Sequence, residues 1–256
     1  MSGVIHKSML LLTLLEPNGE KEDWSTTEIS RELKIPVQTV HRLLNCLCEV
    51  GFVVQDRETR RFRLGTKIME LGFSIRENMS VRNASLPFLI KLSNETKENV
   101  RLSIAEGSEG VVIESVNSVN PIYNFNTGVE CIRLPLSIDA ANKVILANLS
   151  FRLRDKIITE LTEKDIVKDR TDLEEELRLI KQHGFSITPG EKTTGLTNIA
   201  APIFSWDNTV AASISLSINS ASQNNQLNKI IDSLLKYANA ISEELGWRIG
   251  MIKALR

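Results

Sequence analysis

The order of the helix and turn signals in residues 4–64 constrains the fold of this chain more than any other feature. The apolar run of residues 4–15 predicts a helix that ends at the turn Pro17-Asn18-Gly19. The run Ser25-Thr26-Thr27-Glu28 has the form of a capping box, in which the serine accepts from the third helical N–H and the glutamate reaches back. It predicts a short helix that ends near Leu33.

A third helix is predicted from Pro36, which suits a first helical position, to Val50, with Gly51 ending it. Its apolar stripe consists of Val40, Leu43, Leu44 and Leu47. Alternating residues then predict strands at 52–55 and 61–64, which form an arginine-rich hairpin. Two helices, a turn, a third helix and a basic hairpin are typical of a winged helix-turn-helix over residues 1–65.

Residues 66–79 predict a linker helix between two domains. One side of it carries Ile68, Leu71, Ile75 and Met79. This stripe is expected to pack either against a second copy of the chain or back on its own domain.

Residues 80–256 predict an α+β domain. A helix around Phe88–Leu92 precedes the rest; strands are expected at 100–106, 111–116, 121–126, 197–205 and 210–217, and helices at 138–149, 152–160, 172–183 and 224–247. Strands in pairs with helices grouped between them indicate an antiparallel sheet flanked by helices.

The third helix has a polar face suited to reading DNA. Opposite the apolar stripe lie Gln38, Thr39, Arg42, Asn45 and Glu49. Gln can bond adenine, Arg can fork onto guanine, and the Thr methyl suits thymine. The competing interpretation is a solvated helix face, but the ordered set of signals favours DNA binding.

Phosphate contacts are predicted on either side of that helix. Ser25, Thr26 and Thr27 stand at a helix N-terminus, where hydroxyls and free N–H groups suit a phosphate. The hairpin contributes Arg57, Arg60, Arg61 and Arg63. Residues 31–63 carry an excess of only three basic side chains, so two copies on a two-fold site are expected to be needed for tight binding.

Residues Ser25–Val53 resemble the signature of IclR-type bacterial transcription regulators. The resemblance continues through RRFRLGTKIMELG, RLPLSIDAANKVILA and residues Gly184–Ser217, so it covers essentially the whole chain. It implies a winged helix-turn-helix, a linker helix and a GAF-like effector domain. It also implies a homodimer or homotetramer that binds a double-stranded, palindromic DNA operator, most often as a repressor, and responds to a small organic-acid or sugar-acid effector.

The resemblance also implies an effector site. Its lining corresponds here to Leu134, Ala140, Ala141, Asn142, Thr188, Leu196, Asn198, Ser215 and Ser217. Small residues at a helix start are expected to expose N–H groups to an anion. Ordinary core packing is the alternative for each residue taken singly.

The chain departs from the family pattern at four of its positions. Ser137 replaces a His and Asn142 a Gly, while the usual acid is absent at Thr188 and the usual Cys at Asn198. The changes remove two metal ligands, and the asparagines would suit the hydroxyls of a sugar-derived effector. Arg101 or Arg133 could clamp a carboxylate, although a surface ion pair is the commoner role.

Composition narrows the remaining classes. The net charge is −1 and the chain has three cysteines, so a disulfide framework is excluded and a cytoplasmic location is expected. The apolar run 9–15 is too short to cross a membrane. No catalytic motif, metal pair or cofactor site is found; the three His, like Cys46 and Cys48, lack partners by spacing. The alternatives are a GAF-like metabolite sensor and an enzyme, each without DNA binding.

Overall fold

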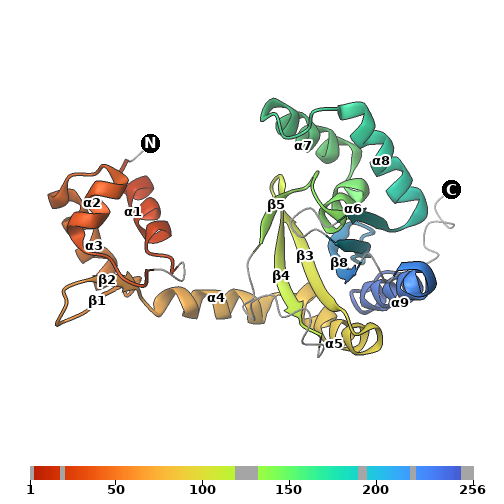
Figure 1. Ribbon diagram of the computed structural model, residues 1–256, viewed down its shortest axis with the longest axis horizontal. Helices are drawn as coiled ribbons and strands as arrows, with labels where there is room; N and C mark the ends of the chain where they lie inside the picture. The colour runs from red at the N-terminus through yellow and green to blue at the C-terminus, as the bar shows by residue number, and fades with distance from the viewer. Residues whose placement is uncertain (1–2, 18–20, 119–131, 190–194, 220–222, 249–256) are drawn as a thin grey trace. The chain divides into compact units, whose positions relative to one another are not determined.

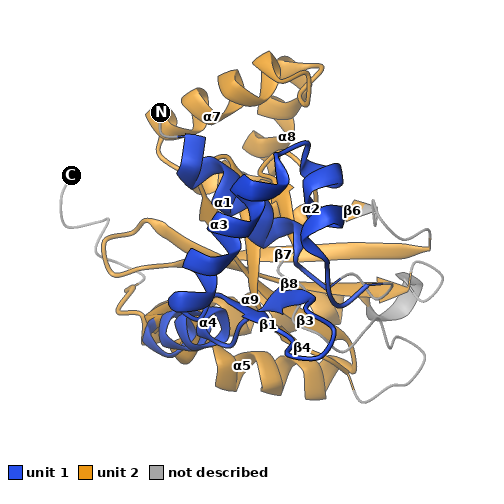
Figure 2. Ribbon diagram, turned by 90° about the vertical axis from the view of Figure 1, so that its left-hand side faces the viewer, with its two compact units in different colours: residues 1–78 blue, residues 79–256 orange. Residues whose placement is uncertain are grey.

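The computed structural model describes residues 3–17, 21–118, 132–189, 195–219 and 223–248. It divides into two compact units, residues 1–78 and 79–256, each considered by itself (Figure 2). The predicted strand 121–126 and Cys131 lie outside the described residues. Within the described ranges, no helix is both long and apolar enough to cross a membrane.

The first unit consists of four helices and a small hairpin (Figure 1). Its elements are α1 (Gly3–Leu14), α2 (Thr26–Leu33), α3 (Val37–Glu49), β1 (Val53–Gln55), β2 (Phe62–Leu64) and α4 (Lys67–Asn78). The core is formed by Leu11, Leu15, Ile29, Val40, Leu44 and Phe62. The apolar stripes predicted from the sequence are thus the faces that pack together.

Two details at the ends of α3 separate expectation from structure. Pro36 is the N-cap of α3 and not its first helical residue, so the helix begins one residue later than predicted. Gly51 has φ +77°, a left-handed conformation that glycine adopts without steric cost, and it ends the helix as predicted.

Helix α4 has no buried residue. The alternative that its apolar stripe packs back on its own domain is therefore wrong. Leu71 is 44% exposed and Ile75 is 64% exposed. The stripe is too short and too far from the first unit's core cluster to join it.

The second unit contains a six-stranded antiparallel sheet with the order β5-β4-β3-β8-β7-β6. Its strands are β3 (Asn99–Glu106), β4 (Glu109–Val116), β5 (Arg133–Pro135), β6 (Ser186–Pro189), β7 (Leu196–Phe204) and β8 (Val210–Asn219). Its helices are α5 (Ser80–Thr96), α6 (Ala140–Asn148), α7 (Phe151–Glu163), α8 (Arg170–His183) and α9 (Gln223–Glu244). The edge strands β5 and β6 were not predicted from the sequence.

The two faces of this sheet differ in chemistry. Leu102, Ile214 and Leu216 belong to the apolar cluster covered by α5 and α9. Because side chains alternate along a strand, their neighbours Arg101, Ser215 and Ser217 point to the other face. That face is covered by α6, which packs with α7 and α8 in a second core (Figure 1). The predicted effector residues therefore gather on a polar face beneath α6.

Candidate nucleic-acid interface and ligand site

The outer face of α3 presents the predicted base-reading side chains. Gln38, Arg42 and Asn45 are exposed and Thr39 is half-buried, while Val40, Leu43 and Leu44 are buried on the opposite side. Asn45 Nδ2 lies 3.4 Å from His41 Nδ1. Among the described residues no carboxylate pairs with Arg42. The guanidinium is thus available to an external acceptor.

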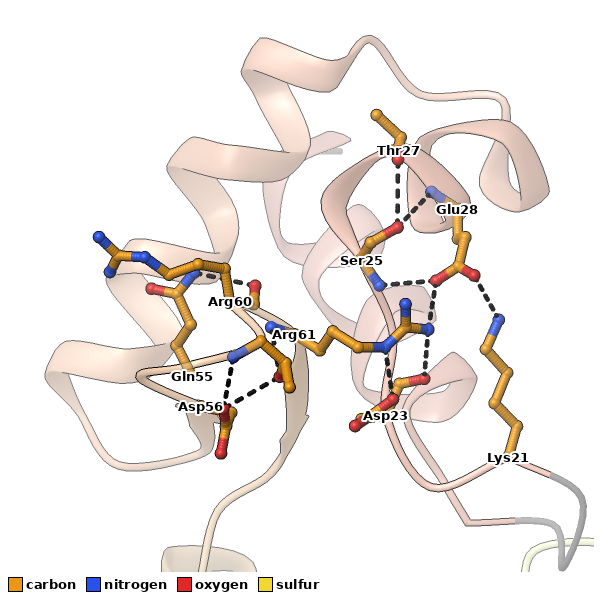
Figure 3. A network of polar contacts seen from close by, with 10 residues as sticks. Lys21, Asp23, Ser25, Thr27, Glu28, Gln55, Asp56, Arg60 and Arg61 are labelled. Carbon is orange, nitrogen blue, oxygen red and sulfur yellow. Dashed lines mark hydrogen bonds and ion pairs between the residues drawn. The ribbon is translucent and has the colours of Figure 1, made fainter.

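The predicted capping box is present at the start of α2. Ser25 Oγ accepts from Glu28 N at 3.3 Å, and Ser25 N donates to Glu28 Oε2 at 2.7 Å (Figure 3). The backbone hydrogen bond from Ser25 lowers the pKa of Glu28 to about 2. Ser25 Oγ also lies 3.1 Å from Thr27 Oγ1. The serine hydroxyl is therefore engaged within the helix end, whereas the Thr27 side chain is exposed.

Arg61 differs from the other hairpin arginines. Its Nε donates to Asp23 Oδ1 at 2.5 Å and its Nη2 to Glu28 Oε2 at 2.7 Å (Figure 3). The hydrogen bond to Asp23 raises the pKa of Arg61. This guanidinium ties the hairpin to the start of α2, a role that the sequence could not show because Asp23 is 38 residues away.

The hairpin tip is held rigid by its own polar groups. Asp56 Oδ1 accepts from the backbone N–H of Glu58 at 3.0 Å and of Thr59 at 2.8 Å. Gln55 Nε2 donates to the Arg60 carbonyl at 3.0 Å (Figure 3). Exposed guanidinium groups without an ion pair in the described chain stand around this tip, at Arg57, Arg60 and Arg63.

In the second unit, a carboxylate joins several predicted effector residues. Asp139 Oδ1 accepts from Asn198 Nδ2 at 2.9 Å, from Thr188 Oγ1 at 3.3 Å and from Ala140 N at 2.7 Å. Ser217 Oγ donates to Asn198 Oδ1 at 2.6 Å. The structure thus brings Ala140, Thr188, Asn198 and Ser217 together. Asp139 was missed, although an Asp before a helix is a recognised N-cap signal.

Asp139 corrects the expectation that the start of α6 exposes an N–H group to an anion. The Ala140 N–H already donates to the Asp139 carboxylate and to Thr188 Oγ1, the latter at 3.1 Å. Asp139 has φ +69° and ψ 153°, a region occupied almost only by glycine, at a cost of about 1–3 kcal/mol. The surrounding hydrogen bonds hold it there.

Asn142 is occupied in a different way from its neighbours. Its Nδ2 lies 3.3 Å from both the Leu134 and the Pro135 carbonyl oxygens, so it fastens α6 to β5. Of the other predicted lining residues, Ala141 and Ser215 are buried and Leu196 is half-buried in β7. The Asn142 amide is therefore used within the fold.

The two arginines proposed as clamps have different surroundings. Arg133 forms ion pairs with Glu106 and, at 3.7 Å, with Glu109, in agreement with the surface ion-pair interpretation. Arg101 forms none with any described residue. Within the described part of the chain, no cluster of three His, Cys, Asp or Glu could hold a metal ion.

Comparison with known proteins places these two sites in one context. Residues 4–57 match the IclR helix-turn-helix domain, and residues 73–243 match the bacterial transcriptional regulator IclR C-terminal family. The chain is 26% identical to the HTH-type transcriptional regulator XynR of Escherichia coli K12, over 95% of this chain and 97% of that protein.

It is also 28% identical to the E. coli K12 HTH-type transcriptional repressor AllR, over 83% of this chain and 79% of the other. Its fold resembles an IclR homolog from Microbacterium hydrocarbonoxydans complexed with 4-hydroxybenzoate, with a TM-score of 0.75 and 22% identity, over 94% of this chain and 98% of that one. The chain therefore belongs to the IclR family of bacterial transcriptional regulators and is a DNA-binding regulator, not an enzyme.

Proposed function

We propose that this protein is a repressor whose α3 reads a palindromic operator and whose second unit binds a small hydroxylated organic acid or sugar acid. The observation that carries the DNA-reading role is the exposed, unpaired Arg42 on α3, beside Gln38 and above a buried apolar stripe. The repressor assignment is supported by the similarity to the repressor AllR.

Contacts with the DNA backbone come from the hairpin tip and the start of α2. Arg57 and Arg60 are exposed and unpaired among the described residues, and Thr27 presents its hydroxyl beside the N-terminus of α2. Arg61 contributes mainly by holding the hairpin against α2, because its charge is balanced by Asp23 and Glu28. These contacts position α3 and carry no sequence information themselves.

The protein acts as at least two copies. The exposed apolar stripe of α4 offers a surface for self-association. A two-fold pair doubles the phosphate contacts, which compensates for the small local excess of positive charge.

The effector site lies on the polar sheet face beneath α6, centred on Asp139, Asn198 and Ser217. Amide, hydroxyl and carboxylate groups suit a polyhydroxylated ligand. The 4-hydroxybenzoate held by the Microbacterium homolog, which carries both a hydroxyl and a carboxylate, is consistent with a small acid.

The DNA-reading role is tested with Arg42→Ala and Arg60→Ala on duplexes that the wild type enriches from random sequence. Arg42→Ala is expected to cost about 1–3 kcal/mol and to relax selectivity at one base pair, because a bidentate base contact is lost. Arg60→Ala is expected to weaken all duplexes alike and to reduce the salt slope by about one. Wild-type selectivity in the Arg42 variant, measured by fluorescence anisotropy, would show that α3 is not the reader.

A further inference from the structure

The sheet face beneath α6 contains a guanidinium without a counter-charge. Arg101 lies on β3 directly opposite Ser215 of β8, and its neighbours Val100 and Leu102 are fully buried on the other face. The alternation along the strand directs Arg101 to the same side as Ser215 and Ser217. Its side chain is half-buried, and no described residue pairs with it. A partly desolvated charge in this position favours an anionic partner.

Hydroxyl groups next to Arg101 also lack partners. Ser213 is fully buried, and its Oγ has no hydrogen-bond partner among the described residues. It points to the same face, two residues from Ser215, whose hydroxyl makes no hydrogen bond to a described residue either. A buried polar group without a partner is unfavourable, so these hydroxyls indicate a place that a polar ligand completes.

The opposite end of this face is negative. Asp139 is hydrogen-bonded to Asn198 of β7 and Thr188 of β6, while Arg101 is on β3. The strand β8 separates β3 from β7, so the backbones that carry the two ends are about 10 Å apart. A carboxylate placed beside Asp139 would be repelled, and one placed beside Arg101 would be attracted.

We propose that Arg101 binds the carboxylate of the effector, and that the hydroxyl groups of the same molecule face Asp139 and Asn198. The ligand class is therefore a hydroxylated monocarboxylic acid, bound with its acid end over β3 and β8 and its hydroxylated end toward the start of α6. This inference rests on the effector site proposed above and adds the residue and the orientation that select the ligand.

The test uses the full chain and acids paired with their uncharged amides: gluconate with gluconamide, lactate with lactamide, and 4-hydroxybenzoate with 4-hydroxybenzamide. Thermal shift identifies the acid that binds, and calorimetry gives its Kd for wild type, Arg101→Gln and Arg133→Gln. Loss of a hydrogen-bonded charge pair is expected to weaken binding by Arg101→Gln about 10- to 100-fold. The matched variant Arg133→Gln is expected to bind as wild type does, since that side chain is paired on the surface.

Wild type is expected to bind the amide about as weakly as Arg101→Gln binds the acid. Equal affinity of Arg101→Gln and wild type for the acid, equal affinity of wild type for acid and amide, or no binding of any acid would overturn the inference. If Arg101→Gln does not fold, the acid and amide comparison on wild type decides. DNA affinity of the ligand-free wild type is measured in parallel: its absence would overturn the proposed regulator function while an acid-specific, Arg101-dependent Kd still supports the inference.

Discussion

Two glutamates of the second unit, three residues apart, have pKa values shifted in opposite directions. Burial raises the pKa of Glu98 to about 7. Hydrogen bonds from Ser233 and Tyr237, at 2.6 and 2.8 Å, lower the pKa of Glu95. The raised value means that the folded state binds more protons than the unfolded state between pH 4.5 and 7, so Glu98 costs stability as pH rises through this range. The lowered value has the opposite consequence for Glu95.

Replacing Glu98 by Gln is expected to raise Tm at pH 8 by about 2–4 °C, which corresponds to about 1 kcal/mol for a partly buried carboxyl, and to change little at pH 5. The control Glu95→Gln is expected to lower Tm at pH 8, because it removes the favoured anion, with a smaller effect at pH 4. Thermal unfolding followed by circular dichroism at the stated pH values measures both. A Glu98→Gln chain with the same Tm as wild type at pH 8 would show that the carboxyl is solvated.

At the scale of elements, the helices were the most predictable features because each has a periodic apolar stripe. The capping box of α2 and the glycine end of α3 were also local signals. The edge strands β5 and β6 are three and four residues long, and distant pairing holds them, such as Gly110 with Leu134 and Thr188 with Asn198. No local pattern can reveal a strand that long-range pairing defines.

Helix α6 and strand β4 fit together through one close contact. A Cβ added to Gly110 would overlap the Asn142 side-chain amide, which also bonds the β5 carbonyls. Gly110→Ala is therefore expected to cost about 1–3 kcal/mol by overpacking. Asn142→Ala is expected to recover at least about 1 kcal/mol of that cost in the double variant. Urea unfolding of the four chains measures the coupling, and strictly additive losses would show that the two residues do not meet.

The whole molecule consists of two units with separate cores, and this explains which parts of the sites were predictable. The first unit's predicted polar face follows from helix periodicity, and α3 presents it as expected. The roles of Arg61 and Asp139 depend on contacts across long stretches of chain, with Asp23 and with Asn198, so no sequence pattern identifies them. The roles of the DNA-contacting and effector residues themselves remain proposals.

The exposed stripe of α4 predicts that self-association and DNA binding are lost together. Ile75→Glu is expected to shift the protein toward a 28.7 kDa monomer and to roughly halve the salt slope of DNA binding, because half the phosphate contacts are lost. Ser74→Glu adds the same charge on the same helix, outside the predicted stripe, and is the control. Sedimentation velocity measures the mass; an Ile75→Glu protein of unchanged mass would place the interface elsewhere.

The measurement that tests the account most directly is the affinity for the operator with and without the acid that raises Tm. Two sites coupled through the protein are expected to change the Kd for DNA by about 5- to 150-fold, and the acid's Kd must change by the same factor when DNA is bound. An acid that binds the second unit tightly and leaves the Kd for DNA unchanged would contradict the claim that this protein is a ligand-responsive regulator.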